Sequence, residues 1–177
     1  MSGSSIISCA KIATLALMPL LFACSKGDAV FSDVPQIEFL EIQIEQDVLG
    51  KDSMVLISFS FQDGDGDIGL GDTDTDPPFN FGNTHFQNLP IEIQYNNGGV
   101  FEELLNPSNN QPFQLHERIP RITPEGKNKA ITGKITVSVP ANPGNTRPGQ
   151  VRYKLQLEDR KLHSSNIITT PSITLIH

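Results

Sequence analysis

Residues 54–61 read MVLISFSF, and this stretch decides the fold. Apolar side chains occupy every second position, and serines separate the last of them; the apolar positions are Val55, Ile57, Phe59 and Phe61. Successive side chains of a β-strand point to opposite faces of a sheet. This period of two therefore predicts a strand that turns one face into a core.

The same pattern, or an enrichment in β-branched residues, recurs along the chain and predicts further strands. These runs are residues 37–44, 91–95, 100–105, 131–139, 151–157 and 167–176. Residues 95–100 read YNNGGV and predict a hairpin, because Asn and Gly accept the positive φ of tight turns. About seven or eight short strands separated by Pro and Gly predict an all-β, antiparallel β-sandwich with immunoglobulin-like (Ig-like) topology.

The amino terminus predicts export and lipid attachment. Residues 12–23 read IATLALMPLLFA, which suits the apolar region of a signal peptide but is shorter than the roughly 20 residues that span a bilayer. Leu21, Ala23 and Cys24 resemble the lipobox of bacterial lipoproteins, which implies cleavage after Ala23 and lipid on the sulfur of Cys24. The alternative is an ordinary secretory signal followed by a chance cysteine. We expect a signal at 1–23, a lipidated linker at 24–35 and one domain at 36–177.

Composition limits the partners and the means of stabilisation. The signal would remove Cys9, and lipid would occupy Cys24, so the folded part has no disulfide. Loss of Lys11 changes the formal net charge from −7 to −8, which disfavours nucleic acid as a partner. No Lys or Arg lies between Lys51 and Arg118, whereas ten of the thirteen lie from Arg118 to Lys161. We expect these charges to pair within a monomer rather than to drive self-association.

The acidic segment at residues 61–79, FQDGDGDIGLGDTDTDPPF, predicts a cation site. Six carboxylates fall within fourteen residues, at Asp63, Asp65, Asp67, Asp72, Asp74 and Asp76. Alternating Asp and Gly let a loop curl so that oxygens converge, and hard oxygen ligands suit Ca²⁺. The first five positions resemble an EF-hand or thrombospondin-type calcium loop. Ile68 replaces the turn glycine and Asp74 replaces the bidentate Glu, so a true EF-hand is not expected.

Topology adds a second segment to this site. In an Ig-like sandwich the loop between strands B and C and the loop between strands F and G emerge at the same end. Residues 159–165, DRKLHSS, would form the second loop, so Asp159 is a further candidate ligand. The candidate Ca²⁺ ligands are therefore Asp63, Asp65, Asp67, Asp72 and Asp159. The alternative is a solvated loop whose charges are met by Arg160 or Lys161 in place of a metal.

The carboxyl-terminal segment carries a family resemblance. Residues 151–176, VRYKLQLEDRKLHSSNIITTPSITLI, resemble the F strand, turn and G strand of bacterial Ig-like or fibronectin III-like domains, with matching positions at Asp159, Ser165 and Asn166. Together with the signal and the DGDGDIG loop, they resemble small uncharacterised lipoproteins of Bacteroidetes. The resemblance implies an envelope protein, in the outer rather than the inner membrane, and no assigned activity. Whether it faces the periplasm or the cell surface stays open.

No arrangement typical of catalysis stands out in the sequence. There is no Gly-x-Ser-x-Gly, no His-Glu-x-x-His, no phosphate loop and no available cysteine. We therefore expect a non-enzymatic binding or structural module with a Ca²⁺-stabilised loop. The alternative is an accessory lipoprotein that captures a glycan or protein, although the chain has no Trp to serve as a sugar platform. A hydrolase that uses the carboxylates ranks third.

Overall fold

The computed structural model describes residues 31–123, 129–145 and 149–176. The expected signal peptide and Cys24 lie outside these residues. The described elements are β1 (Gln36–Gln46), β2 (Asp52–Asp63), β3 (Ile91–Asn97), β4 (Val100–Glu103), β5 (Ile131–Pro140), η1 (Pro143–Asn145), β6 (Gly149–Leu155), β7 (Ile168–Thr169) and β8 (Ile173–Leu175). Within the described residues, no helix has the length and apolar character needed to cross a bilayer.

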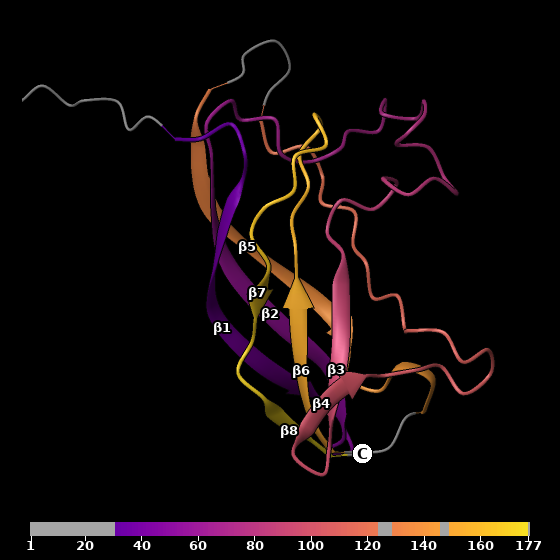
Figure 1. The fold of residues 1–177 in the computed structure, drawn as a ribbon. Helices are drawn as coiled ribbons and strands as arrows, with labels where there is room; N and C mark the ends of the chain where they lie inside the picture. Colours follow the sequence, from indigo (N-terminus) through magenta and orange to yellow (C-terminus); the bar gives the residue numbers. More distant parts are fainter. Residues whose placement is uncertain (1–30, 124–128, 146–148, 177) are drawn as a thin grey trace, which may run out of the picture.

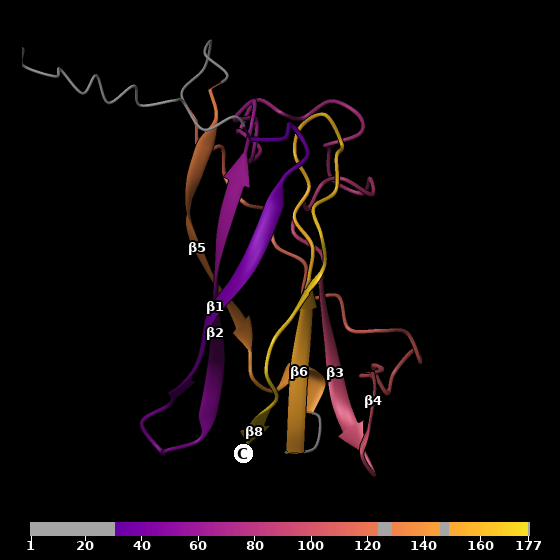
Figure 2. The ribbon, with the colours of Figure 1, turned by 60° about the vertical axis from the view of Figure 1, so that its left-hand side comes forward.

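The strands form two antiparallel sheets that face each other (Figures 1 and 2). One sheet has the order β1-β2-β5, and the other has the order β4-β3-β6-β7, with β8 also paired to β6. In immunoglobulin letters these are sheets A-B-E and C′-C-F-G. The predicted antiparallel Ig-like β-sandwich is therefore confirmed.

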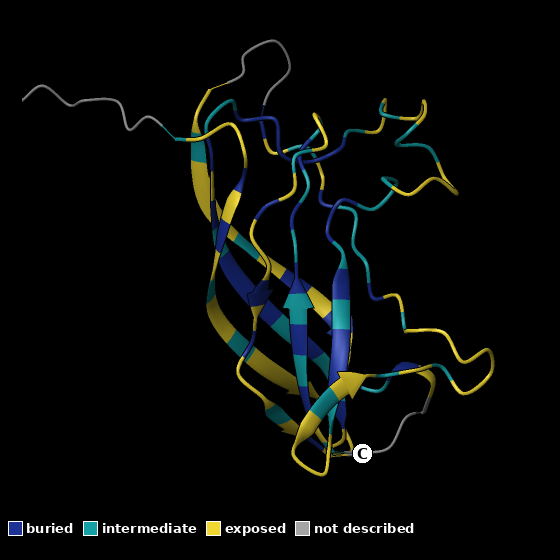
Figure 3. Ribbon diagram, in the orientation of Figure 1, coloured by how far each residue is buried: buried dark blue, intermediate teal, exposed yellow. Residues whose placement is uncertain are grey.

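The alternating residues of β2 lie at the centre of the core, as their period predicted. Val55, Ile57 and Phe59 are fully buried, and they face the second sheet, which contributes Tyr153 and Leu155. Burying such a side chain contributes about 1.5–3 kcal/mol. Figure 3 shows these buried positions along the strands of both sheets. Burial of apolar residues from both sheets holds the sandwich together.

The predicted strand at residues 167–176 is wrong as a single element, because it is divided into β7 and β8. Pro171 lies in the gap and has no N–H for a ladder hydrogen bond. The neighbouring Thr170 replaces that pairing with its side chain. Its Oγ1 accepts the backbone N–H of Tyr153 at 3.0 Å and donates to the carbonyl oxygen of Pro171 at 2.9 Å.

One end of the sandwich gathers three segments that are distant in sequence. The loop after β2 and the loop after β6 emerge there, and β1 begins there (Figure 1). The backbone N–H of Gly64 donates to the carbonyl oxygen of Ser32 at 2.8 Å. The segment that precedes β1 therefore lies directly against the aspartate loop.

Candidate metal centre

The two loops meet at this end of the sandwich, as the topology predicted. Ile68 forms an antiparallel bridge with Asp159, and the N–H of Arg160 donates to the carbonyl oxygen of Asp67 at 3.3 Å. This pairing brings three carboxylates together, those of Asp63, Asp67 and Asp159. One oxygen from each lies within 4.8 Å of the others.

These carboxylates are withdrawn from solvent. The exposed fractions of Asp63, Asp67 and Asp159 are 0%, 2% and 2%. The Oδ1 atoms of Asp63 and Asp67 are buried and, among the residues that the structure describes, accept no hydrogen bond. Burying an ionised carboxylate without a partner costs free energy, and a cation bound between these oxygens would offset that cost.

The other oxygens of the cluster are held in place by hydrogen bonds. Asp63 Oδ2 accepts the backbone N–H of Asp67 at 2.9 Å. Asp159 Oδ1 accepts the backbone N–H of His163 at 2.8 Å, and its Oδ2 lies 2.9 Å from His163 Nδ1. His163 therefore orients Asp159 in the way that outer partners orient metal ligands.

The raised pKa values of Asp63 and Asp67 show that ionising these buried carboxyl groups is unfavourable in the absence of a cation. Burial raises the pKa of Asp63 to about 6, and the charges of Asp65 and Asp159 add to the rise. Burial also raises the pKa of Asp67 to about 6, and the charge of Asp159 is the next cause. A divalent cation would reverse both effects, because it supplies the opposite charge inside the protein.

Asp65 stands at the edge of the cluster. Its Oδ1 is buried and has no hydrogen-bond partner, whereas its Oδ2 pairs with Lys161. Burial raises the pKa of Asp65, but the hydrogen bond and charge of Lys161 outweigh burial and leave that pKa below its ordinary value. Asp65 does not belong to the group of three carboxylates whose oxygens lie within 4.8 Å of one another, so the structure places it beside that group rather than in it.

Two of the residues selected from the sequence occupy other positions. Asp72 is exposed and does not belong to the carboxylate group. Arg160 donates from Nη1 to the carbonyl oxygen of Gly69 at 3.0 Å and, within the described residues, forms no ion pair with the aspartates. Its charge opposes the rise in the pKa of Asp67 without cancelling it. Lys161, rather than Arg160, forms the ion pair with the DGDGD segment, and Asp65 is its one ion-pair partner among the described residues.

Residues after position 117 brace the long loop, a more specific role than the charge pairing that the sequence predicted for these basic residues. The guanidinium of Arg118 donates to the carbonyl oxygens of Gly71, Asp74, Phe79 and Phe86. Arg121 pairs with Asp74 at 3.2 Å, and Thr123 Oγ1 donates to the carbonyl oxygen of Gly66 at 2.7 Å. The only signal in the sequence was the return of basic residues at Arg118.

Gly66 is required by the close packing of the loop. Its φ is +70°, and a Cβ at this position would lie 1.9 Å from the carbonyl oxygen of Lys129. Only glycine meets both conditions. The DGDGD spacing therefore serves the backbone path as well as the placement of the carboxylates.

The chain has no match among protein-family models, curated proteins or solved structures. Its function must therefore be inferred from the geometry of its own residues.

The donor set fits a hard divalent cation. Ca²⁺ binds oxygens at 2.3–2.6 Å, so two ligand oxygens on opposite sides of one ion lie about 4.6–5.2 Å apart. The separation of up to 4.8 Å among the three carboxylates agrees with this geometry. All the candidate ligands are oxygens, which favours Ca²⁺ over metals that prefer nitrogen or sulfur. The residues that would hold the ion are Asp63, Asp67 and Asp159, and the charge of Asp65 lies beside them.

Proposed function

We propose that the protein is a non-enzymatic, lipid-anchored module of the bacterial cell envelope, whose sandwich is stabilised by Ca²⁺ between two loops. The observation that carries the calcium site is the pair of buried Oδ1 atoms of Asp63 and Asp67, which have no hydrogen-bond partner in the described part of the chain. Resemblance to Bacteroidetes lipoproteins supports the outer membrane as the location, and the anchor would be lipid on Cys24.

The position of the site supports a structural role for the ion. Asp63 ends β2, in the first sheet, whereas Asp159 follows β6, in the second sheet. A cation bound to both carboxylates would join the two sheets at the end of the sandwich. The mature chain has no disulfide that could do the same. Metal binding in such a place contributes directly to the free energy of folding.

The burial of the carboxylates argues against a catalytic role. General acids, general bases and metal-bound water must reach a substrate. The three clustered carboxylates are at most 2% exposed, and His163 and Lys161 hold neighbouring oxygens. A closed site of this kind suits an ion that holds loops together.

Calorimetric titration of Ca²⁺ into full-length protein, stripped with EDTA and kept in a mild detergent, tests the calcium site. We expect saturable binding of one ion and a rise in melting temperature, both absent in Asp63→Asn. Asp76→Asn, which changes an exposed aspartate of the same loop, is the matched control and should bind normally. Absence of heat in the unmodified protein would overturn the proposal.

Fractionation of cells that express the protein tests the anchor. We expect the unmodified protein in the membrane fraction and Cys24→Ser in the soluble fraction, because one lipidated cysteine is the only proposed attachment. The intact mass of the membrane form should show cleavage before Cys24 and added lipid. Recovery of both forms in the soluble fraction would contradict the anchor and leave the calcium site untouched.

A further inference from the structure

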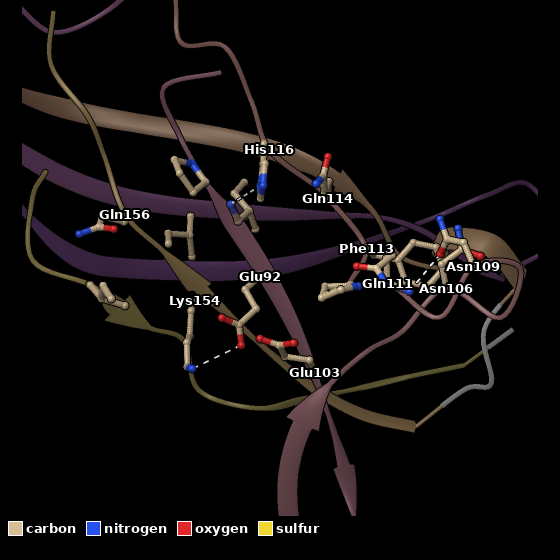
Figure 4. A pocket seen from close by; sticks show the side chains of 15 residues that line it. Glu92, Glu103, Asn106, Asn109, Gln111, Phe113, Gln114, His116, Lys154 and Gln156 are labelled. Atoms are coloured by element: carbon tan, nitrogen blue, oxygen red, sulfur yellow. Dashed lines mark hydrogen bonds and ion pairs between the residues drawn. The ribbon is translucent and has the colours of Figure 1, made fainter. Parts of the chain in front are cut away.

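A cavity of about 740 Å³ lies on the second sheet, and none of its lining residues belongs to the aspartate cluster. Its floor is the face of β3 and β6 that carries Glu92 and Lys154, and its wall is the segment at residues 106–116 (Figure 4). Its volume falls within the range of about 300–1,000 Å³ that is typical of small-molecule sites.

The wall is held against the sheet by hydrogen bonds. The N–H of Leu104 donates to the carbonyl oxygen of Ile93 at 3.0 Å, and the N–H of Phe113 donates to that of Leu104 at 3.1 Å. Gln87 Nε2 donates to the carbonyl oxygen of His116 at 2.8 Å. The cavity is therefore built by paired segments, and its shape exists before any ligand arrives.

Side-chain amides are the most numerous polar groups in the lining. Nine of the fifteen lining residues are polar or ionisable, and five of those nine are amides: Asn106, Asn109, Gln111, Gln114 and Gln156. An amide offers both donors and an acceptor, as a sugar hydroxyl does. Asn106 and Asn109 already use Oδ1 to accept a backbone N–H, and Gln156 uses Nε2 to donate to a backbone carbonyl oxygen, so these three retain only part of that capacity. Within the described residues, the side chains of Glu103 and Gln114 have no hydrogen bond or ion pair, so both can pair with a ligand.

The ring of His116 is fixed by the backbone. Its Nδ1 accepts the N–H of Ile91 at 3.0 Å, so the neutral ring carries its proton on Nε2. The ring therefore adds one donor to the cavity. Phe113 and Ile167 line the cavity as well and supply apolar surface for the C–H groups of a ligand.

We propose that this cavity binds a neutral, polyhydroxylated ligand, namely an oligosaccharide. Amides and one uncommitted carboxylate pair with vicinal hydroxyls, and the apolar residues cover the ring faces between them. This function is separate from the calcium site and stands without it.

The same lining disfavours other classes of ligand. Lys154 is the one cation among the fifteen lining residues, and its Nζ lies 3.3 Å from Glu92 Oε1, so an anionic ligand would have to compete for it. An extended peptide would usually add to a sheet edge. Here β3 is paired on both sides, to β4 and β6, so the floor has no free edge.

The test is calorimetric titration of full-length protein with neutral oligosaccharides, in a detergent that has no sugar headgroup. The probes are cellotetraose, maltotetraose, mannotetraose and xylotetraose, and tetraglycine is the peptide probe. We expect saturable binding of at least one sugar and a shift of the His116 ring signals in the NMR spectrum. Glu103→Ala and Gln114→Ala should each weaken that binding about tenfold, which corresponds to the loss of one good hydrogen bond.

Glu102→Ala is the matched control. Glu102 neighbours Glu103 in β4, but its carboxylate pairs with Tyr95 and Asn97 and does not line the cavity. This variant should bind the sugar as the unmodified protein does. The proposal is overturned if no sugar binds at millimolar concentration, if only the peptide binds, or if the two cavity variants bind as tightly as the control.

Discussion

Replacing Asp67 by asparagine should stabilise the metal-free protein and abolish its response to Ca²⁺. Asparagine has the same shape as aspartate but no charge, so the substitution removes repulsion from the cluster without leaving a void. The same change removes one of the three carboxylates that a cation would need. A general weakening of the fold would lower the stability of the metal-free protein. It therefore cannot produce a gain in that stability together with a loss of the response to Ca²⁺.

The magnitude of the first effect follows from the pKa. Burial raises the pKa of Asp67 from its ordinary value of 3.8 to about 6. At about 1.4 kcal/mol for each unit of pKa, the ionised carboxylate destabilises the metal-free fold by at most about 3 kcal/mol. Screening by solvent reduces this figure, so we expect a gain of about 1–2 kcal/mol.

The second effect follows from mass action. Ca²⁺ at a hundred times its dissociation constant should stabilise the unmodified protein by about 2.7 kcal/mol. For a domain of this size, about 1 kcal/mol moves the melting temperature by about 2–4 °C. The unmodified protein should therefore melt about 5–10 °C higher with Ca²⁺ than with EDTA, whereas Asp67→Asn should melt at one temperature in both.

Thermal and urea denaturation, each with EDTA and with Ca²⁺, provide the assay. Asp76→Asn controls for the loss of one negative charge from the same loop and should leave both effects unchanged. If Asp67→Asn is less stable than the unmodified protein in EDTA, the carboxylates are not in repulsion and the reasoning fails. If it still responds fully to Ca²⁺, the ion binds elsewhere.

Three further predictions concern the same fold. In EDTA, the free energy of unfolding should fall as the pH rises from about 4 through about 6. Burial raises the pKa of Asp63 and Asp67, so the folded state binds their protons more tightly than the unfolded state does. Urea denaturation at several pH values, with and without Ca²⁺, checks this, and an unchanged midpoint in EDTA would contradict it. Gly66→Ala should destabilise the protein by about 2 kcal/mol or more, because the new Cβ would lie 1.9 Å from a backbone carbonyl oxygen. Gly98→Ala, also at positive φ but with open space around it, should lose less stability in thermal denaturation. Equal losses of stability would show that the close approach at Gly66 has no effect. Tyr153→Phe should raise the free energy of unfolding by about 1 kcal/mol, because the buried hydroxyl of Tyr153 has no hydrogen-bond partner among the described residues. A loss of stability on thermal denaturation would show that the hydroxyl does form a hydrogen bond.

The strands could be predicted from the sequence because their signal is local. In β2 every second side chain enters the core, and the pattern needs no knowledge of the partner strands. The meeting of the two loops was also predictable, but only through the topology, since Asp63 and Asp159 are distant in sequence. The fold class could thus be predicted from local alternation of side chains, whereas the meeting of the two loops could be predicted only from the topology of the sandwich.

Asp72 shows where spacing alone was insufficient. Ile68 pairs with Asp159, and Leu70 then pairs with Pro120, so the chain is led away from the cluster before it reaches Asp72. The second of these pairings depends on a segment about fifty residues later, whose course no local pattern reveals. The amide-lined cavity escaped prediction for the same reason, because its residues come from β3, β4, β6 and a loop and share no spacing.

The arrangement of the two proposed sites follows from the direction of the chain. Because β1 begins beside the aspartate loop, and the N–H of Gly64 holds the carbonyl oxygen of Ser32, the linker from a lipid anchor would leave the domain at the calcium site. An ion that fixes Asp63 to Asp159 would therefore stiffen the part of the sandwich that carries the load of the tether. The face of β3 and β6 lies to the side of that end, so a sugar could occupy its cavity without contact with the ion. Loss of calcium should then loosen the packing of the segment around Ser32 against the aspartate loop before it affects ligand binding.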